Sequence, residues 1–127
     1  MATVLLYNIK NPDKRMTIKR CLFRLGLPCR DVEPAAFGHP LGYLLGLEGY
    51  APGESGESFE GEMLVMHNLN RLQFGALLDA LRTSGAPVAL KAVVTETNAS
   101  WSSARLYQEL EKEHRAMQSA GKRKKHP

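Results

Sequence analysis

Hydroxyl and amide side chains gather where a predicted strand gives way to a predicted helix, in the stretch KAVVTETNASWSS at residues 91–103. The first residues of a helix have backbone N–H groups without partners, and the helix dipole adds a partial positive charge there. Such a place can hold an anion or a carbonyl group, with Lys91 on the preceding strand as the nearest cation. The candidate ligand-binding residues are Lys91, Thr95, Thr97, Asn98, Ser100 and Trp101, with Tyr43 as a cover.

The same residue types also have an ordinary structural use. Asn98 or Ser100 can act as the N-cap of the helix, and such a cap stabilises a helix by about 1 kcal/mol. Trp101 then anchors the turn, and Lys91 protects an edge strand from pairing with another sheet. Of the two interpretations, the structural one is favoured. The same residues are retained as the candidate ligand-binding site.

Catalytic patterns are weak by comparison. The four histidines are scattered, with no two at metal-ligand spacing on one element: His39, His67, His114 and His126. Cys21 and Cys29 lie eight positions apart, outside the usual metal or redox spacings. We therefore expect no metal, no cofactor and no catalytic residue. One enzymatic alternative is left open, because acyl phosphate hydrolases with a ferredoxin-like fold use an arginine and an amide, for which Arg15 and Asn68 are the candidates.

Positive charge is segregated along the chain. Residues 10–30 hold seven Lys or Arg, whereas residues 31–70 hold none. The last residues, GKRKKHP at 121–127, are expected to form a disordered basic tail. Because this tail accounts for much of the net charge of +4, the composition supports nucleic-acid binding only weakly. A nucleic-acid-binding domain is still kept as an alternative, since the basic helix within residues 10–30 could meet phosphates, although aromatic-rich RNA-binding patterns are absent.

Length and composition indicate one ordinary domain. The chain has 127 residues, enough for a single core, which we expect over residues 1–120. Its 43% hydrophobic and 24% charged residues are typical of soluble globular proteins. No apolar run approaches the roughly 20 residues that a spanning helix needs, so we expect no membrane partner and a cytoplasmic location.

An internal repeat is the strongest pattern. TVLLYNI at 3–9 aligns with MLVMHNL at 63–69, and each apolar run predicts a buried strand. Apolar positions at helical spacing follow in both copies, namely Ile18, Cys21, Leu22 and Leu25, then Phe74, Leu77, Leu78 and Leu81. Each helix then stops at a glycine followed two residues later by proline, at 25–28 and 84–87. A second strand follows each stop.

Two such units, over 3–34 and 62–97, predict an α+β fold. We expect a ferredoxin-like βαββαβ antiparallel sheet with both helices on one face and the first strand of each unit in the centre. An extra C-terminal helix is expected over 100–118. The alternative is a three-layer α/β fold with a parallel sheet. Between the units, the apolar part of the connection should pack, whereas residues 51–61 should be a disordered loop or a lid.

Four stretches resemble a known family: PLGYLLGLEGY at 40–50, EMLVM at 62–66, LLDALR at 77–82 and VALKAVVTETNASW at 88–101. Together they are similar to an uncharacterised bacterial family called domain of unknown function 3783. The resemblance implies that Lys91, Thr95, Thr97, Asn98 and Trp101 correspond to the family's signature, as do residues 40–43. Members of that family usually have proline between the two threonines, where this chain has Glu96. The resemblance implies no activity.

The sequence as a whole favours a non-catalytic module that binds a small molecule or anion, or another protein. One open sheet face and the apolar stretch at 40–47 favour a homodimer. Nucleic-acid binding is the first alternative, and an acyl phosphate hydrolase is the second.

Overall fold

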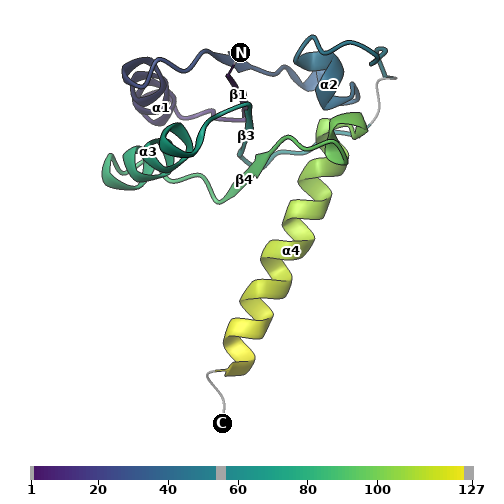
Figure 1. The fold of residues 1–127 in the computed structure, drawn as a ribbon. Coiled ribbons are helices and arrows are strands. Elements are labelled where there is room, and N and C mark those ends of the chain that lie inside the picture. Colours follow the sequence, from purple (N-terminus) through teal and green to yellow (C-terminus); the bar gives the residue numbers. More distant parts are fainter. Residues whose placement is uncertain (1, 54–56, 125–127) are drawn as a thin grey trace.

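A computed structural model describes residues 2–53 and 57–124 of the chain (Figure 1). Its elements follow in the order β1 (Thr3–Tyr7), α1 (Pro12–Arg24), β2 (Cys29–Asp31), the short 3₁₀ helix η1 (Pro34–Ala36), α2 (Leu41–Leu44), β3 (Met63–His67), α3 (Arg71–Thr83), β4 (Leu90–Val93), a second 3₁₀ helix η2 (Asn98–Ser100) and α4 (Ser103–Lys124). Both predicted strand–helix–strand units are therefore present, as β1–α1–β2 and β3–α3–β4.

The two units meet at the centre of one four-stranded sheet, whose order is β2-β1-β3-β4. β1 and β3 are antiparallel neighbours, and Leu5 lies opposite Val65. These two residues are also equivalent in the sequence repeat, so a pseudo-twofold axis passes between them. The prediction that the first strand of each unit is central is confirmed.

The strand order differs from the predicted ferredoxin-like sheet. β2 pairs with β1 and β4 pairs with β3, both in parallel, so the sheet is mixed rather than antiparallel. The ferredoxin-like order needs β2 and β3 to be adjacent antiparallel strands, an arrangement that a short hairpin connection favours. Here a long connection carries its own helices between them, and β3 reaches the opposite edge of β1. The alternative of a parallel sheet agrees with the pairing inside each unit, but the two units pair with each other antiparallel.

The two long helices begin and end by the same devices. Asn11 caps α1 by accepting hydrogen bonds from two backbone N–H groups, and Asn70 caps α3 in a capping box with Gln73. Gly26 and Gly85 follow the helices at φ values of 68° and 73°, in the left-handed region that favours glycine. The duplicated stop signal in the sequence is thereby explained.

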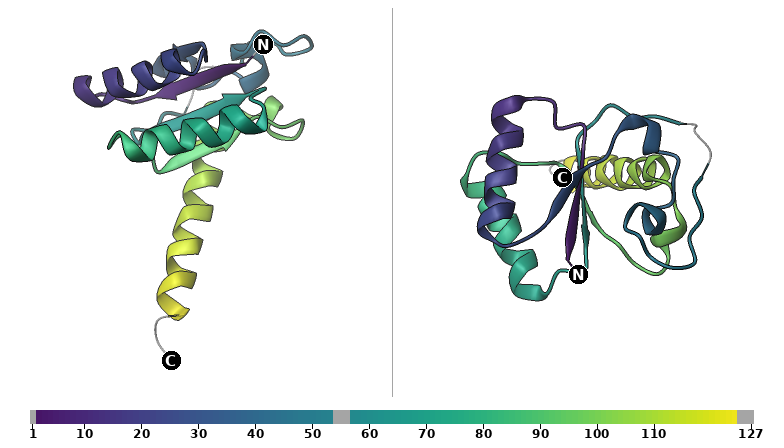
Figure 2. Two further views of the ribbon diagram at one scale, coloured as in Figure 1. Left: turned by 60° about the vertical axis from the view of Figure 1, so that its left-hand side comes forward. Right: turned by 90° about the horizontal axis from the view of Figure 1, so that it is seen from above.

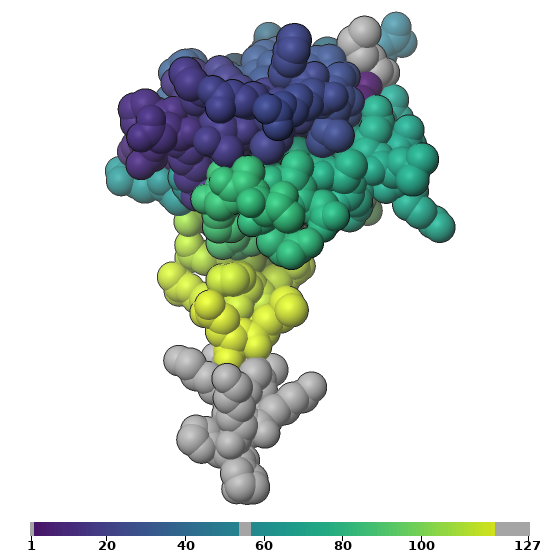
Figure 3. Space-filling view, turned by 90° about the vertical axis from the view of Figure 1, so that its left-hand side faces the viewer, coloured from purple at the N-terminus to yellow at the C-terminus, as the bar shows by residue number. Residues whose placement is uncertain are grey.

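Both helices cover the same face of the sheet, as predicted. α1 and α3 lie side by side in the space-filling view (Figure 3). Ile18 and Leu22 of α1, with Leu77 and Leu81 of α3, pack into one core with the sheet. The strand residues of this core are Val4, Leu6, Leu64 and Met66.

The opposite face is also covered, so the prediction of an open sheet face is wrong. Phe37, Leu41 and Leu44 from the connection form a second core with the strands and with the start of α4. Seen from above, the sheet lies between α1 and α3 on one side and α2 and α4 on the other (Figure 2). The apolar residues of the connection cover the face that would otherwise be free for a second copy.

Part of the connection that was predicted to be disordered or a lid is held on the sheet. Phe59 is buried, and its ring stacks on that of Phe37 with the ring centroids 4.3 Å apart. The Asn8 side-chain amide donates to the carbonyl oxygens of Phe59 and Gly61 at 2.9 and 3.0 Å. Residues 57–61 are thus not a free lid, and residues 54–56 lie outside the described part.

α4 leaves the sheet and extends away from the body (Figure 1). It begins at Ser103 instead of residue 100 and continues to Lys124, past the predicted end at 118. Glu111 and Arg115, one turn apart on α4, form an ion pair at 3.0 Å. Residues 121–124 of the predicted tail belong to α4, whereas residues 125–127 lie outside the described residues, so only the disorder of these last three stays a prediction.

Candidate functional site

The turn after β4 uses its polar groups within the protein. Asn98, only 8% exposed, accepts from the Thr95 backbone N–H at 2.8 Å and donates to the Val93 carbonyl at 3.1 Å. The Thr95 hydroxyl accepts from the Asn98 backbone N–H at 3.1 Å. These three bonds end the edge strand and close the turn, so the side chains of Thr95 and Asn98 have a structural role.

The N-cap of α4 is a residue that the sequence analysis did not identify. The Ser102 hydroxyl accepts from the Arg105 backbone N–H at 3.1 Å, so Ser102 is the N-cap in place of Asn98 or Ser100. The next hydroxyl, that of Ser103, is fully buried and lies 2.7 Å from the Tyr7 hydroxyl. Burial raises the pKa of Tyr7 well above its usual value, although the bond to Ser103 opposes the shift.

The remaining predicted ligand-binding residues are only partly gathered at this turn: the Trp101 backbone N–H donates to the Asn98 carbonyl at 2.9 Å, and α2, which carries Tyr43, contacts η2. Lys91 is near the start of β4, and its ammonium group donates to the Val88 carbonyl, away from the turn. The Arg105 guanidinium lies over the Trp101 ring, 4.3 Å from its centroid. Tyr43 is 40% exposed on α2 and packs against the His39 ring. Thr97 and Ser100 are exposed, and anion binding here stays a prediction.

The enzymatic pair is also separated. Arg15 reaches Asp31 on β2 at 2.7 Å, whereas Asn68 lines a hollow of about 400 Å³ between α3 and β4. β2 and β4 form the opposite edges of the sheet.

Burial lowers the pKa of His67. Within residues 2–53 and 57–124, no cluster of three or more His, Cys, Asp or Glu side chains is arranged to hold a metal ion.

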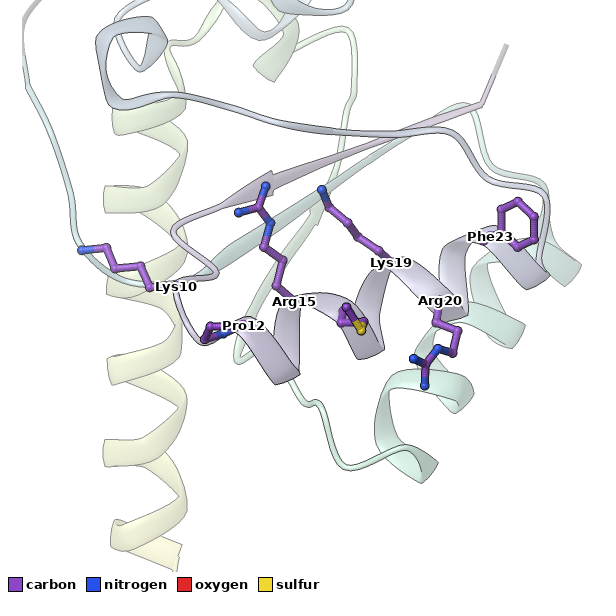
Figure 4. Close-up of a pocket in the computed structure, with 7 residues that line it drawn as sticks. Lys10, Pro12, Arg15, Lys19, Arg20 and Phe23 are labelled. Atoms are coloured by element: carbon purple, nitrogen blue, oxygen red, sulfur yellow. The ribbon is translucent and has the colours of Figure 1, made fainter.

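A different surface combines exposed apolar groups with cations. A hollow of about 600 Å³ runs along the outer side of α1 (Figure 4). Its lining, called the α1 face below, consists of Lys10, Pro12, Arg15, Met16, Lys19, Arg20 and Phe23. Phe23 is 84% exposed and Met16 is 61% exposed. Large apolar side chains in such positions commonly mark interaction sites when polar groups rim them.

The helical period explains how these residues come together. Ile18 and Leu22 face the core, so positions on the other side of the helix face outward. Met16 and Phe23 are seven residues apart, about two turns of an α-helix, and therefore lie on one outward line. The sequence contained this signal, but only the basic residues of this helix were interpreted, as possible contacts for phosphates.

The charges of the α1 face are only partly balanced. Arg15 and Lys19 both lie 2.7 Å from one carboxylate oxygen of Asp31. Burial tends to raise the pKa of Asp31, but hydrogen bonds and charges from Lys19 and Arg15 outweigh it, and this pKa is lowered. In the part of the chain that the structure describes, no carboxylate pairs with Lys10 or Arg20. The face therefore keeps a net positive charge.

The fold defines a mixed α+β domain built from two strand–helix–strand units. Residues 62–117 match the model of the family described as Domain of unknown function (DUF3783). This match runs from just before β3 to within α4, and it agrees with the sequence resemblance over that part of the chain. No curated protein and no solved structure matches the chain. Along the described residues, no helix has the length and apolar character that crossing a membrane requires.

Proposed function

We propose that this protein is a non-catalytic protein-interaction module, and that its α1 face binds an acidic segment of a partner protein. The observation that carries the proposal is the difference between two equivalent helices. α1 has five Lys or Arg and one Asp, a net charge of +4, whereas α3 has two Arg and one Asp, a net charge of +1. α1 also exposes Met16 and Phe23 beside these cations.

Apolar burial and charge complementarity support a protein partner. Burying a Phe or Met side chain contributes about 1.5–3 kcal/mol, so contact with Met16 and Phe23 can supply the apolar part of binding. Arg20 and Lys10 can then pair with carboxylates of the partner, which favours encounter and orientation. An acidic segment with apolar side chains satisfies both features.

Nucleic acid is the second candidate, because the same cations could meet phosphates. The apolar lining by Pro12, Met16 and Phe23 favours a protein over a phosphate backbone. In addition, Arg15 and Lys19 already share Asp31, which reduces the charge available to phosphates. A small anion alone would leave the apolar part of the face without contact.

Selection from a library of displayed random peptides tests the proposal. Peptides that bind the full chain should be rich in Asp, Glu and apolar residues, and should lose affinity for the double variant Met16→Ser/Phe23→Ser. The matched control is Leu72→Ser, which removes an 85% exposed leucine from the equivalent helix α3. Selected peptides that bind the double variant as well as the unmodified protein would remove the support for the α1 face. Preferential binding of RNA or DNA oligonucleotides there would favour the second candidate instead.

A second experiment transfers the surface residues of α1 to the equivalent helix α3 and tests whether α3 gains peptide binding. Gly75, Asp79 and Arg82 of α3 are equivalent to Met16, Arg20 and Phe23 of α1. A Cβ atom on Gly75 meets nothing within 4 Å, so a side chain fits there. The triple variant Gly75→Met/Asp79→Arg/Arg82→Phe should bind a selected peptide at α3 even when Met16 and Phe23 are replaced by serine.

A cytoplasmic location and a homodimer are also proposed, on smaller grounds. Cys21 and Cys29 are both free thiols, which suits a reducing compartment. Leu72 of α3 and Met117 of α4 are exposed apolar side chains outside the α1 face and are candidates for self-association, since both sheet faces are covered. Sedimentation equilibrium of the unmodified protein and of the Leu72→Ser/Met117→Ser variant tests the dimer, which should dissociate in the variant.

A further inference from the structure

We infer that the segment bound by the α1 face is an acidic amphipathic helix with two apolar side chains seven residues apart. This inference rests on the proposed function, and it specifies the shape and charge of the partner. It comes from the spacing of the apolar groups on α1 and from the positions of the cations around them.

The spacing of the apolar groups favours a helix over an extended strand. Met16 and Phe23 lie about 10 Å apart along the helix axis, because an α-helix rises about 1.5 Å per residue. A partner helix lying along α1 matches this distance with side chains at positions i and i+7, both on one side. A strand rises about 3.3 Å per residue and would need side chains three positions apart, which point to opposite faces. A peptide in the β-strand conformation therefore does not present both anchors to α1 from one face.

The two apolar anchors are suited to this contact. Phe23 exposes nearly its whole ring, and Met16 has an unbranched, adaptable side chain. Pro12 continues the same line one turn before Met16, at the start of α1. The apolar line therefore spans most of the helix, long enough to contact several turns of a partner helix.

Cations flank the apolar line on both sides. Arg15 and Lys19 point toward the sheet, whereas Arg20 points the other way (Figure 4). Because Asp31 already balances the first two in part, the stronger attraction for carboxylates lies on the side of Arg20 and, beyond the helix start, at Lys10. A partner helix with Asp or Glu on both borders of its apolar stripe meets these charges, and the side that faces Arg20 should matter most.

Three synthetic peptides of equal length test the inference with the full chain. The first is a helical peptide with leucines at i and i+7 and glutamates on both borders of the apolar stripe. The second has lysine in place of each glutamate. The third has the composition of the first, but its leucines are moved so that no helical face holds them both. Binding is measured by fluorescence anisotropy, and the site is located from amide chemical shifts.

The first peptide should bind with shifts confined to residues 10–24, and its affinity should fall as salt rises. Phe23→Ser should weaken it about 30-fold, the loss typical of an apolar hot spot, and Leu72→Ser should leave it unchanged. Arg20→Gln should weaken it more than Lys19→Gln, because Asp31 already balances Lys19.

Two outcomes separate the inference from the proposed function. If the second or third peptide binds at residues 10–24 as tightly as the first, or if the first does not bind while library-selected peptides do, the helix is refuted and the interaction module stands. If no peptide, designed or selected, depends on Met16 and Phe23, both fail.

Discussion

Helices α1 and α3 occupy equivalent places in the two units, and each spans 13 residues. Ile18 and Leu22 of α1 are matched by Leu77 and Leu81 of α3, and all four are buried against the same sheet face. The outward positions are different: Met16, Arg20 and Phe23 are matched by Gly75, Asp79 and Arg82. The repeat thus keeps its buried positions apolar while its surface positions differ. A function that belongs to one unit should be sought on the surface where the units differ.

The largest expected effects test whether the two units form one core. Leu22→Ala and Leu81→Ala remove equivalent buried side chains, and each should lower the free energy of unfolding by about 2–5 kcal/mol. Because α1 and α3 pack into one cluster, urea unfolding should remain a single transition in both variants. Leu72→Ala, at an exposed position, should change the stability by no more than about 0.5 kcal/mol. Separate transitions for the two units would contradict a shared core.

The face opposite α1 and α3 should depend on one buried hydrogen bond. Tyr7→Phe leaves the buried Ser103 hydroxyl without its partner and should cost about 1–3 kcal/mol of stability in urea unfolding. The pH dependence of the free energy of unfolding provides a second test of this tyrosine. Because the pKa of Tyr7 is raised in the folded state, the folded protein keeps its proton where the unfolded chain loses it, so stability falls as pH rises above about 10.

Burial also raises the pKa of Tyr107, so Tyr7→Phe should reduce that loss and leave the part that Tyr107 contributes. The loss is measured from urea midpoints at about pH 9 and pH 11, on either side of the unfolded pKa. An unchanged alkaline slope in the variant would show that another group is responsible.

Two equivalent asparagines are expected to contribute differently to the stability of the two units. Asn8 and Asn68 follow the central strands with φ values of 58° and 61°, where glycine is at no steric disadvantage. Asn8 also donates two hydrogen bonds to the connection, at 2.9 and 3.0 Å. Asn8→Gly should therefore cost about 1–2 kcal/mol, whereas Asn68→Gly should change stability little. Thermal unfolding of the two variants side by side measures the difference, and equal losses would argue against the Asn8 contacts.

The smallest effect concerns the charges beside the α1 face. Asp31→Asn removes a partly exposed partner of Arg15 and Lys19 and should cost no more than about 1 kcal/mol. Since the folded pKa of Asp31 is lowered, its contribution is present above the unfolded pKa of about 3.9 and is lost as pH falls below it. The same change should strengthen binding of an acidic peptide, because Arg15 and Lys19 become available. Weaker binding would contradict the electrostatic role of this face.

The repeat, the central strands and the shared helix layer could be predicted because they depend on local periodicity. The helical spacing of Ile18 and Leu22 is sufficient to predict the buried face of their helix. The strand order could not be predicted in this way, because periodicity shows which side of a strand is buried and not which strand lies beside it. Apolar residues such as Phe37 and Leu41 were expected to pack, but the sequence did not show that they would cover the second sheet face.

The candidate site was harder to predict because polar side chains are ambiguous in sequence. Asn98 can bind a ligand or close a turn, and only its contacts with Thr95 and Val93 distinguish the two. Met16 and Phe23 carried a readable signal, since both fall outside the apolar stripe of a helix that already has its buried positions filled. Exposed apolar positions on a charged helix were the more informative feature for function.

The most direct measurement of the central claim is an amide chemical-shift map of the full chain during titration with the acidic helical peptide. We predict that the shifted amides lie in residues 10–24 and that the equivalent residues 71–83 do not respond. Shifts that fall instead on α3, or on the turn at residues 95–103, would contradict the claim that the surface difference between the two units carries the function.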